Sequence, residues 1–154
     1  MYLAYDGSLH ADWVARYAIQ MARHEPERAL HLLNVDDRRV APSDLAARLQ
    51  RIEAECRALD VRSSVGLFAL PTGFSSLKRR VASTLMKATA QDKAALLMCG
   101  TRGAGRSNLP WLRGTVSGWL LQQTRVHVLA MRVHQPGLMG SPRRILLPLG
   151  GNPH

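Results

Sequence analysis

The run Ala94-Ala95-Leu96-Leu97-Met98-Cys99, followed at once by Gly100-Thr101-Arg102-Gly103, decides the fold. An unbroken apolar run of this length is typical of a strand that is covered on both faces of a parallel sheet. The glycines that follow end the strand and let the backbone approach a ligand closely. We therefore expect a buried strand that leads into a ligand-binding loop.

Apolar strands and amphipathic helices alternate along the rest of the chain. The expected strands cover residues 3–5, 29–35, 61–70, 94–99 and 126–133. One expected helix follows each of the first four strands, and Ser8 and Ser43 are expected to cap the first two helices. This alternation predicts an α/β fold, a three-layer sandwich with a five-stranded parallel sheet, because right-handed crossovers place helices on both faces.

Polar or flexible residues follow three of these strands directly. Asp6 follows the first strand, Asp36 follows Val35 at the end of the second, and Gly100 follows the fourth. In open parallel sheets, ligands bind beyond the carboxyl ends of the strands, where the strand order reverses. We therefore expect the functional site at this edge.

The glycine-rich loop over residues 100–113 has the chemistry of an anion site. Its free amides can cradle phosphate oxygens, and Gly114-Thr115 opens a helix whose amino end favours an anion. Arg102 and Arg106 offer charge-assisted contacts. The loop lacks the lysine of a P-loop and the last glycine of a dinucleotide fingerprint. A flexible surface loop remains the alternative.

Three motifs together resemble the universal stress protein family: Asp6-Gly7-Ser8, Cys99-Gly100-Thr101-Arg102-Gly103 and Gly114-Thr115-Val116-Ser117. The resemblance covers residues 1–133, which we take as one nucleotide-binding domain. It implies the strand order 3-2-1-4-5, dimerisation through the fifth strand and, in one branch of the family, ATP binding. It also implies a role for each matching position. The adenosine positions would be Ala4, Tyr5, Asp6 and Val35. The ribose would be bordered by Cys99 and Gly100. The phosphates would be surrounded by Arg102, Gly103, Gly105, Gly114, Thr115 and Val116.

Two observations leave alternatives open for this site. Gly103 and Gly114 enclose ten residues, where the family pattern has nine. A carboxylate after a strand, such as Asp6, is also a common turn former. The expected ligand is ATP or AMP, with or without Mg²⁺. The alternative is a relative of the same fold that binds no nucleotide and serves as a dimerisation or partner-docking module.

The net charge of +10 predicts a generally basic surface, but the distribution of the arginines along the chain disfavours a nucleic-acid role. The arginines are scattered, and no run of five or six like charges occurs. A basic nucleic-acid binder on the same fold is therefore the third hypothesis, because such a role needs charges clustered on one face.

Catalysis and metal binding have little support in the sequence. The histidines lack the paired spacing of zinc ligands, so we expect no metal site. For Asp36-Asp37 we favour a solvated loop, and Mg²⁺ binding by the two carboxylates is the alternative. Ser64 and Ser107 are expected to lie near no base. No general base is apparent beside the phosphates, so any ATP hydrolysis is expected to be slow.

The sequence also indicates the cellular compartment and the assembly of the protein. No apolar stretch approaches the ~18 residues of a membrane span, and a secretory leader pattern is missing, so a cytoplasmic protein is expected. Cys56 and Cys99 are expected to be buried, reduced thiols. The strand at 126–133 should leave an open sheet edge that pairs with a second copy or with a second like domain.

The C-terminal residues 134–154 are expected to form a linker and the start of a second repeat. Gln135-Pro136-Gly137 has linker composition, and the stretch from Arg143 to Asn152 echoes the opening strand from Tyr2 to Ser8. The alternative is an ordinary apolar tail that packs on the domain.

Overall fold

Five parallel strands form one sheet in the computed structural model, which describes residues 1–91, 94–101, 115–123 and 126–133. The strands are β1 (Tyr2–Ala4), β2 (Ala29–Asp36), β3 (Arg62–Ala69), β4 (Leu96–Gly100) and β5 (His127–Met131), and their spatial order is β3-β2-β1-β4-β5. The helices are α1 (Leu9–Ala22), α2 (Pro42–Ala58), α3 (Leu77–Gln91) and α4 (Val116–Gln123). The predicted fold class and strand order are therefore confirmed.

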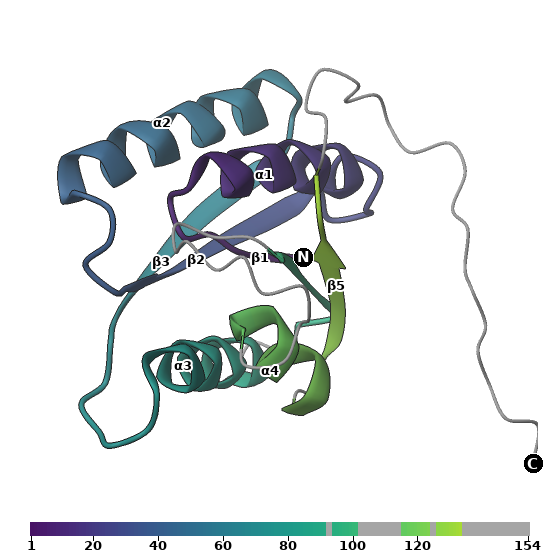
Figure 1. Ribbon diagram of the computed structural model, residues 1–154. Helices are drawn as coiled ribbons and strands as arrows, with labels where there is room; N and C mark the ends of the chain where they lie inside the picture. Colours follow the sequence, from purple (N-terminus) through teal and green to yellow (C-terminus); the bar gives the residue numbers. More distant parts are fainter. Residues whose placement is uncertain (92–93, 102–114, 124–125, 134–154) are drawn as a thin grey trace, which may run out of the picture.

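Figure 1 shows α1 and α2 on one face of the sheet and α3 and α4 on the other. Alternate residues of each strand belong to the cores on the two faces of the sheet, because successive side chains point to opposite faces. Leu3 and Met98 belong to the core beneath α1 and α2. Tyr2 and Leu97 belong to the core beneath α3 and α4. This double coverage explains why the central strands read as continuous apolar runs.

Ser8 caps α1 as expected, but the prediction for Ser43 was wrong. The Ser8 hydroxyl oxygen accepts a hydrogen bond from the Ala11 N–H at 3.1 Å. The second helix begins two residues earlier than expected, at Pro42, and Ala41 occupies the capping position without a side-chain hydrogen bond. Proline suits the first turn because that turn has no partner for a backbone N–H.

A second prediction to be corrected is that Ser64 lies near no base. The Ser64 hydroxyl is 2.6 Å from Nδ1 of His31, and the His31 ring stacks on Tyr2 at 4.7 Å. The three residues face one another across β1, β2 and β3 because Tyr2 pairs with His31 and His31 pairs with Ser64 in the sheet register. Residues this far apart in sequence become neighbours only through strand pairing.

Both cysteines are buried and free, as the sequence predicted. None of the described helices is long and apolar enough to span a bilayer. The predicted linker and second-repeat start, residues 134–154, lie outside the described residues.

Candidate functional site

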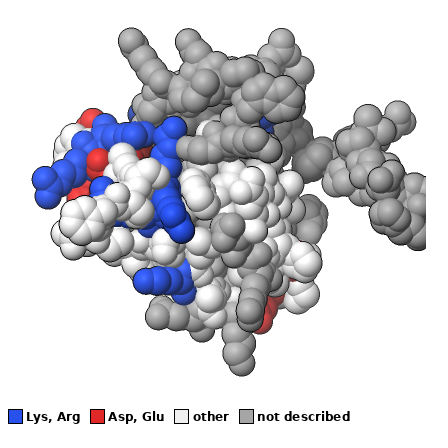
Figure 2. Space-filling view, turned by 60° about the horizontal axis from the view of Figure 1, so that its bottom comes forward, with Lys and Arg blue, Asp and Glu red and all other residues white. Residues whose placement is uncertain are grey.

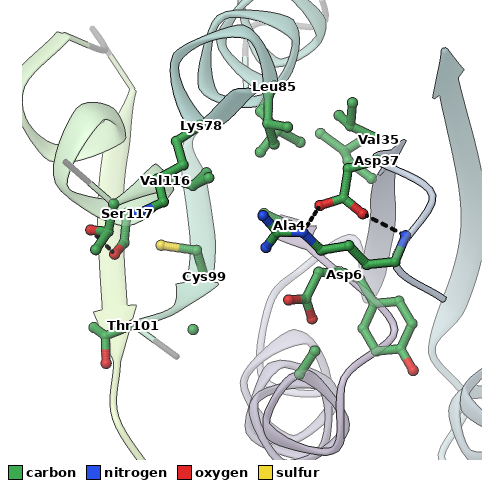
Figure 3. A pocket seen from close by; sticks show the side chains of 17 residues that line it. Ala4, Asp6, Val35, Asp37, Lys78, Leu85, Cys99, Thr101, Val116 and Ser117 are labelled. Atoms are coloured by element: carbon green, nitrogen blue, oxygen red, sulfur yellow. Dashed lines mark hydrogen bonds and ion pairs between the residues drawn. The ribbon is translucent and has the colours of Figure 1, made fainter. Parts of the chain in front are cut away.

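A cavity of about 380 Å³ opens at the carboxyl ends of β1, β2 and β4, with α3 and α4 along one wall. β1 lies between β2 and β4, and the connection from β1 to β2 and the connection from β3 to β4 run over opposite faces of the sheet. A crevice forms at such a reversal because the flanking helices cover opposite faces of the sheet. The cavity therefore lies at the edge of the sheet that the sequence singled out (Figure 3).

Eight of the twelve predicted site residues line this cavity. They are Ala4, Tyr5, Asp6, Val35, Cys99, Gly100, Thr115 and Val116. The other four, Arg102, Gly103, Gly105 and Gly114, lie outside the described residues. Strands β1, β2 and β4 and the start of α4 thus bring together positions that are up to 112 residues apart, from Ala4 to Val116 (116 − 4).

Asp6 is a turn former and also lines the cavity. Its carboxylate accepts a hydrogen bond from the Ser8 N–H at 3.0 Å, so it forms the turn before α1. It also faces the cavity (Figure 3). Gly7 makes this possible, because its φ of +73° is costly for other residues and a Cβ there would come within 3.2 Å of Leu45.

Tyr5 is at the cavity but directs its hydroxyl group elsewhere. The phenol donates a 2.5 Å hydrogen bond to Asp12 on α1, and burial and this contact raise its pKa above the ordinary value. The Tyr5 carbonyl accepts a 2.8 Å hydrogen bond from the Asn34 side chain. Asn34 therefore ties the end of β1 to β2, a positioning role that the sequence did not reveal.

Two charged residues of the loop after β2 line the cavity and were not predicted to do so. Asp37 accepts a hydrogen bond from the Arg39 N–H at 3.2 Å, and its carboxylate lies 3.3 Å from Nε of Arg39. Asp36 is exposed, whereas Asp37 is half-buried and lines the cavity, so reading both as solvated loop was wrong for Asp37. Polar residues in a loop have no periodic pattern that would predict a ligand site. The only signal in the sequence for Asp37 and Arg39 was their position just after the end of a strand.

The wall formed by β4 and α4 carries neutral donors and acceptors. Burial raises the pKa of the Cys99 thiol to about 12, so the thiol is protonated near neutral pH. Thr115 caps α4 by accepting a hydrogen bond from the Gly118 N–H at 3.0 Å, and its hydroxyl lies 3.1 Å from that of Ser117. Thr101, which follows β4, also lines the cavity.

The remaining unpredicted residues of the lining are one cation and four apolar side chains. Lys78 lies in the first turn of α3. The apolar residues are Ala11, Leu33, Val81 and Leu85. Val81 and Leu85 were recognisable as the inner face of their helix, but periodicity does not say that part of this face borders a cavity. In the described part of the chain, no cluster of three or more potential metal ligands occurs.

Comparison with known proteins identifies the family. A model of the universal stress protein family matches residues 1–132. The chain belongs to this family. The resemblance seen in its motifs is thereby confirmed, and the match extends over all five strands of the sheet.

Solved universal stress proteins share the fold at low sequence identity. One from Archaeoglobus fulgidus superposes with a TM-score of 0.62 at 19% identity, covering 85% of this chain and 42% of its own. One from Burkholderia pseudomallei gives a TM-score of 0.53 at 22% identity, covering 84% of this chain and 93% of its own. This chain therefore spans less than half of the first of these proteins.

A further solved structure is a universal stress protein in complex with cAMP. It superposes with a TM-score of 0.54 at 14% identity and covers 86% of this chain and 96% of its own. A search of curated proteins gives no match. Identities this low establish the shared fold, and the ligand has to be argued from the cavity.

Proposed function

We propose that this universal stress protein binds an adenine nucleotide, ATP or AMP, with little or no catalysis. The observation that supports the proposal is the cavity at the reversal of strand order, where Asp6, Val35, Gly100 and Thr115 converge from four separate segments. Ligand sites of this size and mixed lining are usually preformed. The cAMP complex of a related fold supports the choice of an adenine ligand.

The proposed pose follows from the polarity of the lining. Val35 and Leu33 line the β2 side of the cavity, where they would form an apolar surface for the base. The Val35 backbone would make a polar contact with the edge of the base. The Asp6 carboxylate would accept hydrogen bonds from the ribose hydroxyls. The phosphates would lie toward Gly100 and the start of α4, where free backbone amides and the helix dipole favour an anion.

Mg²⁺ would reach this site together with the phosphates. Asp6 and Asp37 both line the cavity, but the first is held by the Ser8 N–H and the second by Arg39. Mg²⁺ usually keeps several water ligands and takes the rest from phosphates and one or two carboxylates. The lining is compatible with that pattern, in which the protein supplies few metal ligands.

Calorimetric titration with ATP tests the binding proposal. Asp6→Asn is the informative variant, because the amide oxygen can keep the turn while the negative charge is lost. We expect it to weaken ATP binding by about tenfold, the effect of losing one hydrogen bond to a charged group. Asp36→Asn is the matched control, since Asp36 makes the same kind of turn with the Arg38 N–H but is exposed and does not line the cavity.

Thermal unfolding provides an independent reading of the same titration. A ligand at ~100 times its Kd adds ~2.7 kcal/mol to the stability of the folded state. No heat of binding and no thermal shift at millimolar ATP or AMP would overturn the proposal. Equal losses in Asp6→Asn and Asp36→Asn would show that Asp6 contributes through the turn and not through the ligand.

We also propose that β5 pairs with a second copy of the chain or with a second like domain. β5 forms one edge of the sheet and pairs with β4 among the described strands. Edge strands present unpaired backbone groups that invite such pairing. The cytoplasmic location and the second-repeat start at 134–154 stay predictions from the sequence.

The two alternative functions are not favoured by a specific observation. Pro110 and Trp111 are bulky residues of the glycine-rich loop, and a relative that binds no nucleotide would have them fill the phosphate space. Both lie outside the described residues. On the face in Figure 2, Lys and Arg side chains gather toward one side with acidic side chains among them, and much of the described surface is uncharged. The acidic side chains among the basic ones distinguish this face from the purely basic patch that is typical of a nucleic-acid surface.

A further inference from the structure

Lys78 stands apart among the charged residues of the cavity. It lies in the first turn of α3, is half-buried, and lines the cavity. Figure 3 shows its side chain extending toward Val116 and Ser117 at the start of α4, on the wall opposite Asp6 and Asp37. A cation from one helix is thus aimed at the amino end of another, along one wall of the space assigned to the ligand.

Helix stability does not explain a lysine at this position. The amino end of a helix disfavours cations, and the first turn of α3 carries no acidic residue. Its two neighbours in that turn have partners outside the cavity. Arg79 lies 5.1 Å from the ring centre of Trp119, and Arg80 donates a 2.9 Å hydrogen bond to the Pro71 carbonyl.

The other cation of the cavity is already compensated. Arg39 forms its ion pair with Asp37 at 3.3 Å, on the β2 side. Within the described residues, no carboxylate lies within ion-pair distance of Lys78. Ser117, toward which it points, carries a neutral hydroxyl group, which lies 3.1 Å from the hydroxyl of Thr115. Among the described residues, the end of the cavity at α3 and α4 therefore carries a net positive charge.

We infer that Lys78 is a specificity-determining residue that contacts the phosphate chain and makes the site favour nucleotides with more phosphates. This inference rests on the proposed function and adds to it a residue outside the glycine-rich motif. An ammonium group on a flexible stem supplies three donors and a full charge, which suits successive phosphate groups. The ribose and base, on the Asp6 and Val35 side, would not contact Lys78.

Titration of three ligands against three proteins tests the assignment. The ligands are ATP, AMP and adenosine, and the proteins are wild type, Lys78→Met and Lys87→Met. Lys87 is the matched control, since it lies on the same helix but is exposed and does not line the cavity. We expect Lys78→Met to weaken ATP binding by about tenfold, AMP binding by less, and adenosine binding hardly at all.

A second variant and a stability measurement separate contact from folding. Lys78→Arg should keep most of the preference for ATP, because it keeps the charge. Lys78→Met should unfold at the same or a slightly higher temperature than wild type, since a cation leaves the amino end of α3. A loss of ATP affinity together with a marked fall in unfolding temperature would count against a ligand contact.

The outcomes distinguish this inference from the function on which it rests. If wild type binds ATP and Lys78→Met binds all three ligands as wild type does, the binding site stands and the role of Lys78 is overturned. If Lys78→Met weakens the binding of all three ligands equally, Lys78 affects the shape of the cavity and does not contact the phosphates, which overturns the inference. If wild type binds none of the three ligands, both the proposed function and the inference fail.

Discussion

Cys99 illustrates how the environment of one residue sets its chemistry. Its thiol is buried at the end of β4 and lines the cavity, and burial raises its pKa from the ordinary 9.0 to about 12. The nucleophilic form of cysteine is the thiolate, so this thiol should be unreactive near neutral pH. Cys56, on the buried face of α2, also has a raised pKa, but it does not line the cavity.

We expect a thiol reagent to modify Cys99 slowly in the folded protein and bound nucleotide to slow it further. Cys56→Ala leaves Cys99 as the single thiol, and Cys99→Ala leaves Cys56 as the matched control. ATP should protect the first protein and not the second, because only Cys99 borders the ligand space. Rates followed with a chromogenic disulfide measure this. Equal protection of both thiols would indicate general stiffening and would contradict the placement of the ligand.

The raised pKa of Cys99 also predicts a pH dependence of stability. The unfolded thiol releases its proton above about pH 9, while the folded thiol holds it to about pH 12. The free energy of unfolding should therefore fall as the pH rises through this window, by up to ~1.4 kcal/mol per pH unit. Urea unfolding of wild type and Cys99→Ala across this range measures the contribution. Parallel curves for the two proteins would contradict the raised pKa.

At the scale of elements, one buried carboxylate joins α1 to α2. Asp12 of α1 is 7% exposed and accepts hydrogen bonds from the Tyr5 phenol and from Arg48 and Arg51 of α2. Tyr5 directly follows β1 and lines the cavity, so the contacts of Asp12 connect both helices to the site. Buried charges are retained only where they are paired and hydrogen-bonded.

We expect Asp12→Ala to lower the free energy of unfolding by ~1–3 kcal/mol, because the Tyr5 hydroxyl loses its partner in a buried position. The two arginines lose little, since both remain partly exposed to water. Glu55→Gln is the control, because its ion pair with Arg16 is 4.0 Å long and exposed, and such pairs contribute ~0–1 kcal/mol. Urea titrations compare the two. Equal small losses would show that the Asp12 contacts do not couple the helices.

At the scale of the whole molecule, the sheet has two edges, β3 and β5. The β3 side exposes large apolar residues, with Leu67 at 65% exposure and Phe74 fully exposed. The family resemblance favours β5 for pairing, whereas exposure alone would favour β3. An experiment on assembly therefore has to discriminate between the two edges.

We expect light scattering to give twice the 17.0 kDa mass of one chain, through pairing at β5. Leu67→Asp should leave that mass unchanged, because Leu67 lies on β3 and is already exposed to water. A monomer at all concentrations would refute self-pairing and would leave a second like domain as the partner of β5. Dissociation of the dimer by Leu67→Asp would instead place the contact at β3.

The sequence by itself determined the order of strands and helices, and with it the edge of the sheet where the cavity lies. Continuous apolar runs such as that ending at Cys99, and the Asp6-Gly7-Ser8 turn, are local patterns that depend on residues near one another in the chain. The expected element bounds differ from the observed ones by one or two residues, and the cap of α2 was misassigned because Pro42 can begin a helix without a side-chain cap.

Only the tertiary structure decided which charged side chains meet in the cavity. Lys78, Arg39 and Asp37 lie in a helix and a loop whose patterns give no sign of a ligand, and the same holds for the contact between His31 and Ser64. The physical reason is that periodicity reports which face of an element is buried, whereas crossovers and strand register decide which distant elements share that buried space.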